Sequence, residues 1–244
     1  MVGPYGCGMP RLVLWDVDHT LIENAGVSKE IYAAAFRALT GDRARHLAQT
    51  DGRTDPEIMA DLLRLHDAPA YPWATVQQAL ELAGAKHHGP LAERGAVLPG
   101  VREIVAELAD AVGVVQTVVT GNIRANAEVK LDALGLRSCF DLDVGGYGSD
   151  GDQRSRLVEF AITRSAAKYG AAYSRAATVV IGDTPRDIQA GRDNDVRVLA
   201  VATGDHSAAE LRDAGANFVV SSLTDVTAAL RFVLAPVDEA TGTP

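Results

Sequence analysis

Three short polar clusters each follow a run of apolar residues, and their side chains are suited to metal and acid–base chemistry. They are Asp16-Val17-Asp18-His19-Thr20, Thr120-Gly121-Asn122 and Gly182-Asp183-Thr184-Pro185-Arg186-Asp187. Carboxylates gathered in one place repel one another unless a cation lies among them. Ligand sets made only of oxygen favour a hard ion such as Mg²⁺. If the fold brings these clusters together, the sequence therefore predicts a metal site at Asp16, Asp18, Asp183 and Asp187.

The apolar runs that precede the clusters have the length and composition of buried strands. Helical patterns lie between them, as in the apolar face made by Val101, Ile104, Val105 and Leu108. This alternation indicates βαβ units and a mostly parallel sheet with helices on both faces. Ligands bind beyond the carboxyl ends of the strands in such sheets, so we expect the clusters to meet at one edge. The expected strands are residues 11–18, 112–120, 178–183, 197–203 and 217–220.

The stretch from about residue 22 to residue 97 breaks this alternation, because it holds successive helical patterns and no buried-strand run. Ser28 is expected to cap a first helix, and Thr54-Asp55-Pro56-Glu57 is typical of the start of a second. A third helix is expected near residues 73–86. We therefore predict an α/β core of residues 1–21 and 98–235, a helical insertion at 22–97, and a flexible tail at 236–244.

Composition excludes several classes of partner. The chain has 244 residues, enough for one large domain with a smaller companion. Its net charge of −9 argues against nucleic acid or an anionic membrane as the main partner, and 5 % aromatic residues provide little for base stacking. No apolar run is long enough to span a bilayer, and the first ten residues lack a signal-peptide pattern. We expect a cytoplasmic protein, of open oligomeric state.

The three clusters, in this order and at the ends of strands, resemble the motifs of haloacid dehalogenase-like (HAD-like) hydrolases. The closest similarity is to the phosphatases with a helical cap, such as phosphoglycolate phosphatases. The resemblance covers nearly the whole chain after residue 10 and rests on residues 16–20, 118–122 and 182–188. It implies a Rossmann-like parallel core with an inserted all-helical cap domain. It also implies an Mg²⁺-dependent phosphatase that hydrolyses a small phosphorylated metabolite, a phosphate monoester.

The resemblance further implies roles for the acidic residues. Asp16 would attack phosphorus as the nucleophile and form an aspartyl-phosphate. Asp18 would protonate the leaving alcohol and then activate water. Mg²⁺ would be held by the Asp16 carboxylate, the backbone carbonyl of Asp18 and the Asp183 carboxylate, and Asp187 would support the waters of the metal.

The remaining expected contacts concern the phosphate. Thr120 would hydrogen-bond a phosphoryl oxygen, with the backbone N–H groups of Gly121 and Asn122 nearby. Most relatives also place a Lys-Pro pair after the third strand, and this chain lacks it. We assign that cationic role to Arg154, with Arg156 as the second choice, because an arginine binds in a bidentate manner and stays protonated.

Two further basic residues receive weaker assignments. Lys130 follows Thr120 on the next expected helix, and we interpret it as a surface residue. Arg53 lies in a turn before a cap helix, in Asp51-Gly52-Arg53-Thr54. Relatives place substrate-contacting residues in cap loops, so Arg53 is either a substrate contact or a solvated loop residue.

Four alternatives to a phosphatase are weighed. A phosphomutase of the β-phosphoglucomutase type shares Asp16, Asp18 and the metal, and differs in how long the phosphoenzyme persists. A dehalogenase is disfavoured, because those relatives lack the second carboxylate that Asp18 supplies. A phospho-receiver is roughly half this length and has no helical insertion. A catalytically silent binding module is the last alternative.

Overall fold

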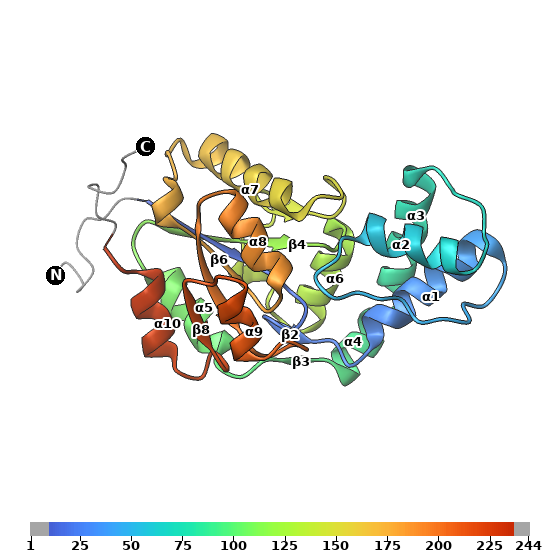
Figure 1. Cartoon of the computed structure of the whole chain (residues 1–244), viewed down its shortest axis with the longest axis horizontal. Helices are drawn as coiled ribbons and strands as arrows, with labels where there is room; N and C mark the ends of the chain where they lie inside the picture. Colours follow the sequence, from blue (N-terminus) through green and yellow to red (C-terminus); the bar gives the residue numbers. More distant parts are fainter. Residues whose placement is uncertain (1–9, 237–244) are drawn as a thin grey trace.

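A computed structural model describes residues 10–236, so all but the first residue of the predicted tail at 236–244 lies outside the described residues. Six parallel strands form one sheet in the order β5-β4-β1-β6-β7-β8 (Figure 1). Within the described range, no helix combines the length and the apolar character that crossing a membrane requires. The strands are β1 (Arg11–Trp15), β4 (Val114–Thr120), β5 (Gly146–Tyr147), β6 (Thr178–Gly182), β7 (Arg197–Val201) and β8 (Phe218–Val220).

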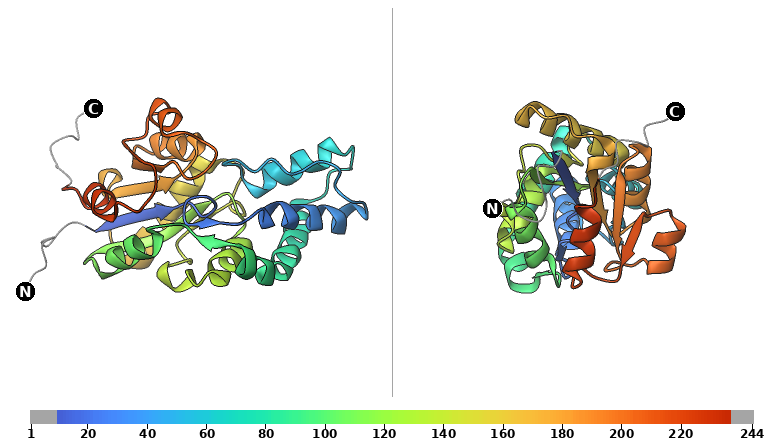
Figure 2. Two further views of the ribbon diagram at one scale, coloured as in Figure 1. Left: turned by 90° about the horizontal axis from the view of Figure 1, so that it is seen from below. Right: turned by 90° about the vertical axis from the view of Figure 1, so that its left-hand side faces the viewer.

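The central strand β1 is buried on both faces, and its side chains alternate between two apolar cores. Val13 and Trp15 pack on the side of α5 (Val101–Asp110), α6 (Arg124–Ala133) and α10 (Val226–Val233). Leu12 and Leu14 pack on the side of α7 (Arg154–Tyr169), α8 (Pro185–Asp193) and α9 (Ala208–Asp213). The right panel of Figure 2 shows the sheet between these two layers. Two short 3₁₀ helices, Arg137–Cys139 and Arg175–Ala177, complete the core.

Four helices inserted after β1 form a separate bundle at one end of the molecule (Figure 1). They are α1 (Val27–Thr40), α2 (Asp55–Leu65), α3 (Trp73–Lys86) and α4 (His88–Arg94). They share an apolar core of their own, which includes Ile31, Phe36, Ile58, Leu62 and Leu80. The structure thus confirms the predicted α/β core with an inserted helical cap.

The two cap-helix starts differ in how well the sequence predicted them. The capping box at Thr54 and Glu57 is present at the start of α2, as predicted. The expectation that Ser28 caps α1 is wrong, because the residue before this helix is Gly26, in a left-handed conformation with φ of 80°. Ser28 lies instead in the first turn of α1, where its hydroxyl is free to bind another residue.

A short antiparallel ribbon joins the cap to the core. Strand β2 (Ile22–Glu23) pairs with β3 (Ala96–Val97), so that the chain enters and leaves the cap side by side. The expected cap boundaries, 22 and 97, are both residues of this ribbon. Strands of two residues are too short to produce an alternating pattern, which explains why no strand was expected in this region.

Candidate active site

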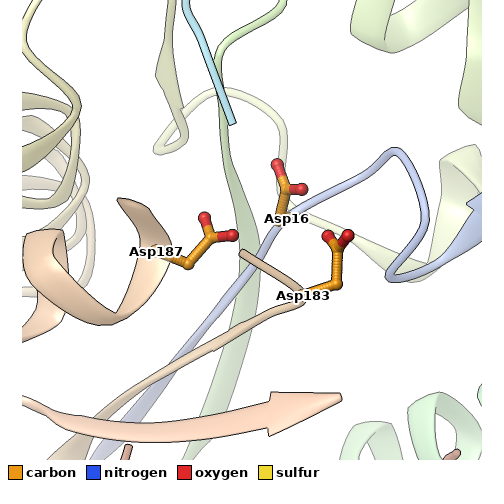
Figure 3. A group of neighbouring side chains, drawn as sticks. All are labelled: Asp16, Asp183 and Asp187. Atoms are coloured by element: carbon orange, nitrogen blue, oxygen red, sulfur yellow. The ribbon is translucent and has the colours of Figure 1, made fainter. Parts of the chain in front are cut away.

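The carboxyl ends of β1 and β6 bring three acidic side chains together. Asp16 follows β1 directly, Asp183 follows β6, and Asp187 lies in the first turn of α8. All three are buried, and one carboxylate oxygen from each lies within 4.8 Å of the others. Figure 3 shows the three side chains turned toward one shared space. The adjacency of β1 and β6 in the sheet, rather than their separation in sequence, creates this cluster.

Arg154, the first residue of α7, supplies a buried positive charge to the cluster. Its Nη2 lies 2.6 Å from Oδ1 of Asp16 and 2.5 Å from Oδ1 of Asp187. Its Nε also donates a hydrogen bond of 2.7 Å to Asp187 Oδ1. Arg156 is exposed, and its guanidinium lies over the ring of Phe160 at 5.5 Å. The structure therefore brings Arg154, and not Arg156, to the carboxylates.

The cluster has less positive charge than its carboxylates need. Burial raises the pKa of Asp16 to about 7, against the attraction of Arg154 and with the repulsion of Asp187 and Asp18. Burial, with the repulsion of Asp16 and Asp187, also raises the pKa of Asp183. A bound cation would stabilise the ionised form of these buried carboxylates. Oxygen ligands and a deficit of positive charge fit a hard divalent ion.

The acidic residues differ in how many of their oxygens are already used. Oδ2 of Asp187 accepts hydrogen bonds from the N–H and hydroxyl of Thr184, and its Oδ1 is held by Arg154. Asp183 accepts one hydrogen bond of 3.0 Å at Oδ1, from Thr20. Asp16 and Asp183 are thus the better metal-ligand candidates, and Asp187 is suited to an indirect role. The backbone carbonyl of Asp18 stays a prediction.

Asp18 is in a different electrostatic setting from Asp16, although only two residues separate them. Burial alone would raise the pKa of Asp18, but the charge of Lys130 and hydrogen bonds from Asn122 and Lys130 lower it to about 2. The ammonium of Lys130 lies 2.6 Å from Oδ2 of Asp18. Neighbouring carboxylates held in such different states are a common arrangement for two distinct catalytic roles.

The interpretation of Lys130 as a surface residue is wrong. Its side chain is 1 % exposed and points into the core between α6 and the site. The missed signal is its position on α6, where it shares the buried face with Ala127 and Leu131. A lysine on the apolar side of an amphipathic helix is costly unless an acid pairs with it. That pattern was visible in the sequence, although the partner was not.

The second cluster, Thr120-Gly121-Asn122, lies beside the acidic group at the end of β4. The hydroxyl oxygen of Thr120 accepts a hydrogen bond of 2.7 Å from Asn122 Nδ2. The hydroxyl proton of Thr120 therefore remains available for a hydrogen bond to a different acceptor. Nδ2 of Asn122 also donates to Asp18 Oδ2 at 2.8 Å, which links this cluster to the first one.

The cap loop before α2 closes directly over this cluster. The N–H of Asp55 donates to the carbonyl of Gly121 at 2.8 Å, and Nη1 of Arg154 donates to the carbonyl of Gly52 at 3.2 Å. A Cβ on Gly121 would lie 2.1 Å from the carbonyl oxygen of Arg53, so only glycine permits this approach. The partly open cavity at this place admits about 60 Å³ of solvent, enough for a few waters or one phosphate-sized group.

Arg53 lines this cavity, but its charged group is used within the cap. Its Nη1 lies 3.1 Å from Oδ2 of Asp61, and its Nη2 donates to the carbonyl of Glu57 at 3.2 Å. The structure therefore places Arg53 at the site and directs its guanidinium toward α2. A direct contact between Arg53 and substrate stays a prediction.

Tyr32 lines the cavity and its hydroxyl contacts Asp55, and the sequence indicated neither contact. The carboxylate of Asp55 is buried, and it accepts hydrogen bonds from the Tyr32 hydroxyl at 2.6 Å and from the Ile123 N–H at 2.7 Å. Burial raises the pKa of Asp55 to about 6, against these two hydrogen bonds. Asp55 thus joins α2 and α1 of the cap to the start of α6 in the core.

Without added metal, the protein is expected to lose stability as pH rises from about 5 to about 8. The pKa values of Asp16, Asp55 and Asp183 are raised in the folded chain. The folded state therefore binds more protons than the unfolded state in this pH window. The stability that these protons contribute is lost as pH rises and the three groups ionise. The free energy of unfolding should fall by on the order of a few kcal/mol. Urea unfolding in EDTA at both pH values measures it.

The matched control for this prediction is Asp55→Asn, which removes one of the three titrations while keeping the size of the side chain. The decrease in unfolding free energy should be smaller in this variant than in the wild type. An unfolding free energy that is constant or rises between the two pH values would contradict the prediction.

Comparisons with known proteins identify the family of this chain. Residues 13–192 match the family model described as haloacid dehalogenase-like hydrolase. The chain is 27 % identical over 230 residues to "Probable phosphatase IndB" of Dickeya dadantii (strain 3937), which covers 93 % of this chain and 96 % of that protein.

Two solved structures illustrate the similarity of fold. The first is CbbY from Rhodobacter sphaeroides in complex with phosphate, with a TM-score of 0.68 and 20 % identity over 89 % of this chain and 96 % of that one. The second is described as "Putative beta-phosphoglucomutase from Bacteroides vulgatus", with a TM-score of 0.63 and 18 % identity over 94 % of this chain and 90 % of that one. At these identities the likeness shows a shared fold.

Proposed function

Because the chain belongs to the haloacid dehalogenase-like hydrolases, we propose that it is a phosphatase that hydrolyses a small phosphate monoester through an aspartyl-phosphate. The observation that carries this proposal is the pair of carboxylates on one strand end. Asp16 faces Arg154 and Asp183, whereas Asp18 is turned to Lys130 and Asn122. This difference in partners supports assigning the attack on phosphorus to Asp16 and the exchange of protons to Asp18. The name of the Dickeya relative, a probable phosphatase, supports the same activity.

In the proposed first step, an oxygen of Asp16 forms a bond to phosphorus while the ester P–O bond breaks. Arg154 holds the Asp16 carboxylate from one side, which limits its rotation before attack. Asp18 donates a proton to the leaving alcohol oxygen. The negative charge of an approaching phosphate raises the pKa of a neighbouring carboxyl, which favours the protonated form of Asp18 at this stage.

In the second step, water attacks phosphorus and the bond to Asp16 breaks. Asp18, now ionised, accepts a proton from that water. We expect the Thr120 hydroxyl to donate to a phosphoryl oxygen in both steps, because its oxygen already accepts from Asn122 and its proton is free for another acceptor. The cap loop at Gly52 covers the cavity and limits access of bulk water.

We propose Mg²⁺ as the metal, with Asp16 and Asp183 as its carboxylate ligands, the Asp18 carbonyl beside them, and Asp187 in support. When bound, the ion neutralises charge on the transferring phosphoryl group. Among residues 10–236, the buried cations that face the four carboxylates are Arg154 and Lys130, so two negative charges are left for a divalent ion to balance. The all-oxygen donor set fits this hard ion.

Removal of the metal is expected to abolish activity. Purified protein with Mg²⁺ should hydrolyse p-nitrophenyl phosphate or a small phosphate ester, and excess EDTA should reduce the rate by at least about 10²-fold. Excess Mg²⁺ should restore it, whereas Ca²⁺, which prefers more ligands and longer distances, should restore much less. Undetectable turnover across a broad panel of phosphate esters would refute the phosphatase assignment. Full activity in EDTA would refute the metal assignment.

The substrate is proposed to be a small phosphorylated metabolite. The cavity admits only a small volume of solvent, and it is lined mostly by polar residues, among them Asn24, Ser28, Thr50 and Asp205. The related CbbY structures hold phosphate and xylulose-(1,5)-bisphosphate, which are ligands of that class. A screen of phosphoglycolate, sugar phosphates and nucleotides, in which the release of inorganic phosphate is measured, identifies the ester.

A phosphomutase is the second candidate, because the fold is shared with a structure described as a β-phosphoglucomutase. A mutase would return the phosphoryl group to another hydroxyl of the substrate and release little inorganic phosphate. Mass balance between inorganic phosphate and isomeric sugar phosphate in the same screen distinguishes the two activities.

A further inference from the structure

Lys130 is a charged group that the proposed chemistry does not yet use. Its ammonium is buried, 2.6 Å from Oδ2 of Asp18 and 2.7 Å from Oδ1 of Asn122. Burying an ammonium is unfavourable unless close partners of opposite charge or polarity offset its loss of hydration. An apolar side chain at this buried position would avoid that cost. The position therefore points to a role in which this charge is needed beside Asp18.

The donors around Asp18 fall into two groups on its two oxygens. Oδ1 accepts from Asn24 Nδ2 at 2.8 Å and from Ser28 Oγ at 3.3 Å. Asn24 lies just before the first cap helix, α1, and Ser28 lies in its first turn. Oδ2 accepts from Asn122 and Lys130, both in the core. The two core donors belong to the same domain as Asp18, so their contacts with Oδ2 do not depend on the cap. They fix Oδ2 and leave Oδ1, held only by neutral donors, as the oxygen that can exchange a proton.

Lys130 also controls the orientation of Asn122. The amide oxygen of Asn122 accepts from the ammonium, so its Nδ2 must face Asp18 and Thr120. A single buried charge thereby sets the direction of the amide that contacts both the Asp18 carboxylate and the Thr120 hydroxyl. Loss of this charge would release both side chains at once.

We propose that Lys130 is a positioning residue, which holds Asp18 so that its Oδ1 meets the leaving-group oxygen. This inference rests on the proposed phosphatase function. It differs from a purely structural role, in which Lys130 would only balance a buried charge. A positioning role acts through proton transfer to the leaving group, so its loss should matter most for alcohols that leave poorly.

Three esters of similar size test this inference: p-nitrophenyl, phenyl and benzyl phosphate. The constant to compare is kcat/KM, because it reports the chemistry up to release of the first alcohol. p-Nitrophenolate leaves without a proton, whereas benzyl alcohol needs one. In Lys130→Met, kcat/KM for benzyl phosphate should fall by about 10²-fold or more, and for p-nitrophenyl phosphate by less than about 10-fold. Lys86→Met, an exposed lysine at the end of α3, is the matched control and should match the wild type on all three esters.

A double variant separates the two roles. If Lys130 acts through Asp18, then Asp18→Asn/Lys130→Met should be no slower on benzyl phosphate than Asp18→Asn alone, within about twofold. This double variant removes both charges of the pair, so it keeps a test available where Lys130→Met alone fails to fold. Equal losses of Lys130→Met on all three esters, or additive losses in the double variant, would overturn the positioning role and leave the phosphatase function intact. A wild-type protein without turnover on any ester would overturn both.

Discussion

Replacing Asp16 by Asn should reduce turnover by at least about 10³-fold, because an amide cannot serve as the phosphoryl acceptor. Asp16→Asn keeps the size of the side chain, and it removes a charge that burial disfavours, since the pKa of Asp16 is raised to about 7. The variant should therefore fold at least as well as the wild type in EDTA. Steady-state kinetics with p-nitrophenyl phosphate and a thermal melt measure the two effects.

The matched control is Asp110→Asn, which changes an exposed carboxyl at the end of α5. Its activity and melting temperature should be those of the wild type. Turnover retained in Asp16→Asn would refute its role as nucleophile. A radiolabelled phosphate that stays on the denatured wild type after a brief reaction, and not on Asp16→Asn, would support the aspartyl-phosphate directly.

Replacing Arg154 by Ala is expected to have the second large effect. Asp16 and Asp187 would lose the guanidinium that lies 2.6 Å from one and 2.5 Å from the other. Removing one partner of a buried ion pair costs about 3–5 kcal/mol of stability, and kcat should fall by on the order of 10²- to 10³-fold. Unfolding in urea and steady-state kinetics measure these two changes.

Two further variants make the Arg154 prediction specific. Arg154→Lys keeps the charge but not the planar fork, so it should fold better than Arg154→Ala and still show a reduced kcat. Arg156→Ala loses only an exposed contact with the Phe160 ring, and its activity should stay within about twofold of the wild type. A larger loss of activity in Arg156→Ala than in Arg154→Ala would show that the cationic role belongs to Arg156.

The strands and the first carboxylates were predictable because both depend on local sequence. Apolar runs such as Leu12-Val13-Leu14-Trp15 define buried strands, and a parallel sheet places the residues that follow them at one edge. The start of α2 was likewise predictable from Thr54 and Glu57. In these cases the residue type and its place in the pattern are sufficient.

The partners of those residues were not predictable in the same way. Lys130 meets Asp18 across 112 residues of sequence, and Tyr32 meets Asp55 only because α1 and α2 pack together in the cap. Ser28 looks like a helix cap by type, yet its hydroxyl donates to Asp18. Such contacts depend on how elements far apart in the sequence pack together, which no single stretch of sequence encodes.

The ribbon of β2 and β3 has an evolutionary consequence. Because Glu23 and Ala96 are paired neighbours, a short turn between them would close the chain without disturbing the sheet. The cap can therefore be exchanged as a module, so that substrate choice and bond-breaking chemistry can diversify separately. Contacts between cap and core constrain the exchange, and those at the general-acid candidate are made by Asn24 and Ser28, which hold one oxygen of Asp18. An incoming module must supply donors of its own at that oxygen, while Lys130 and Asn122 stay behind with the core.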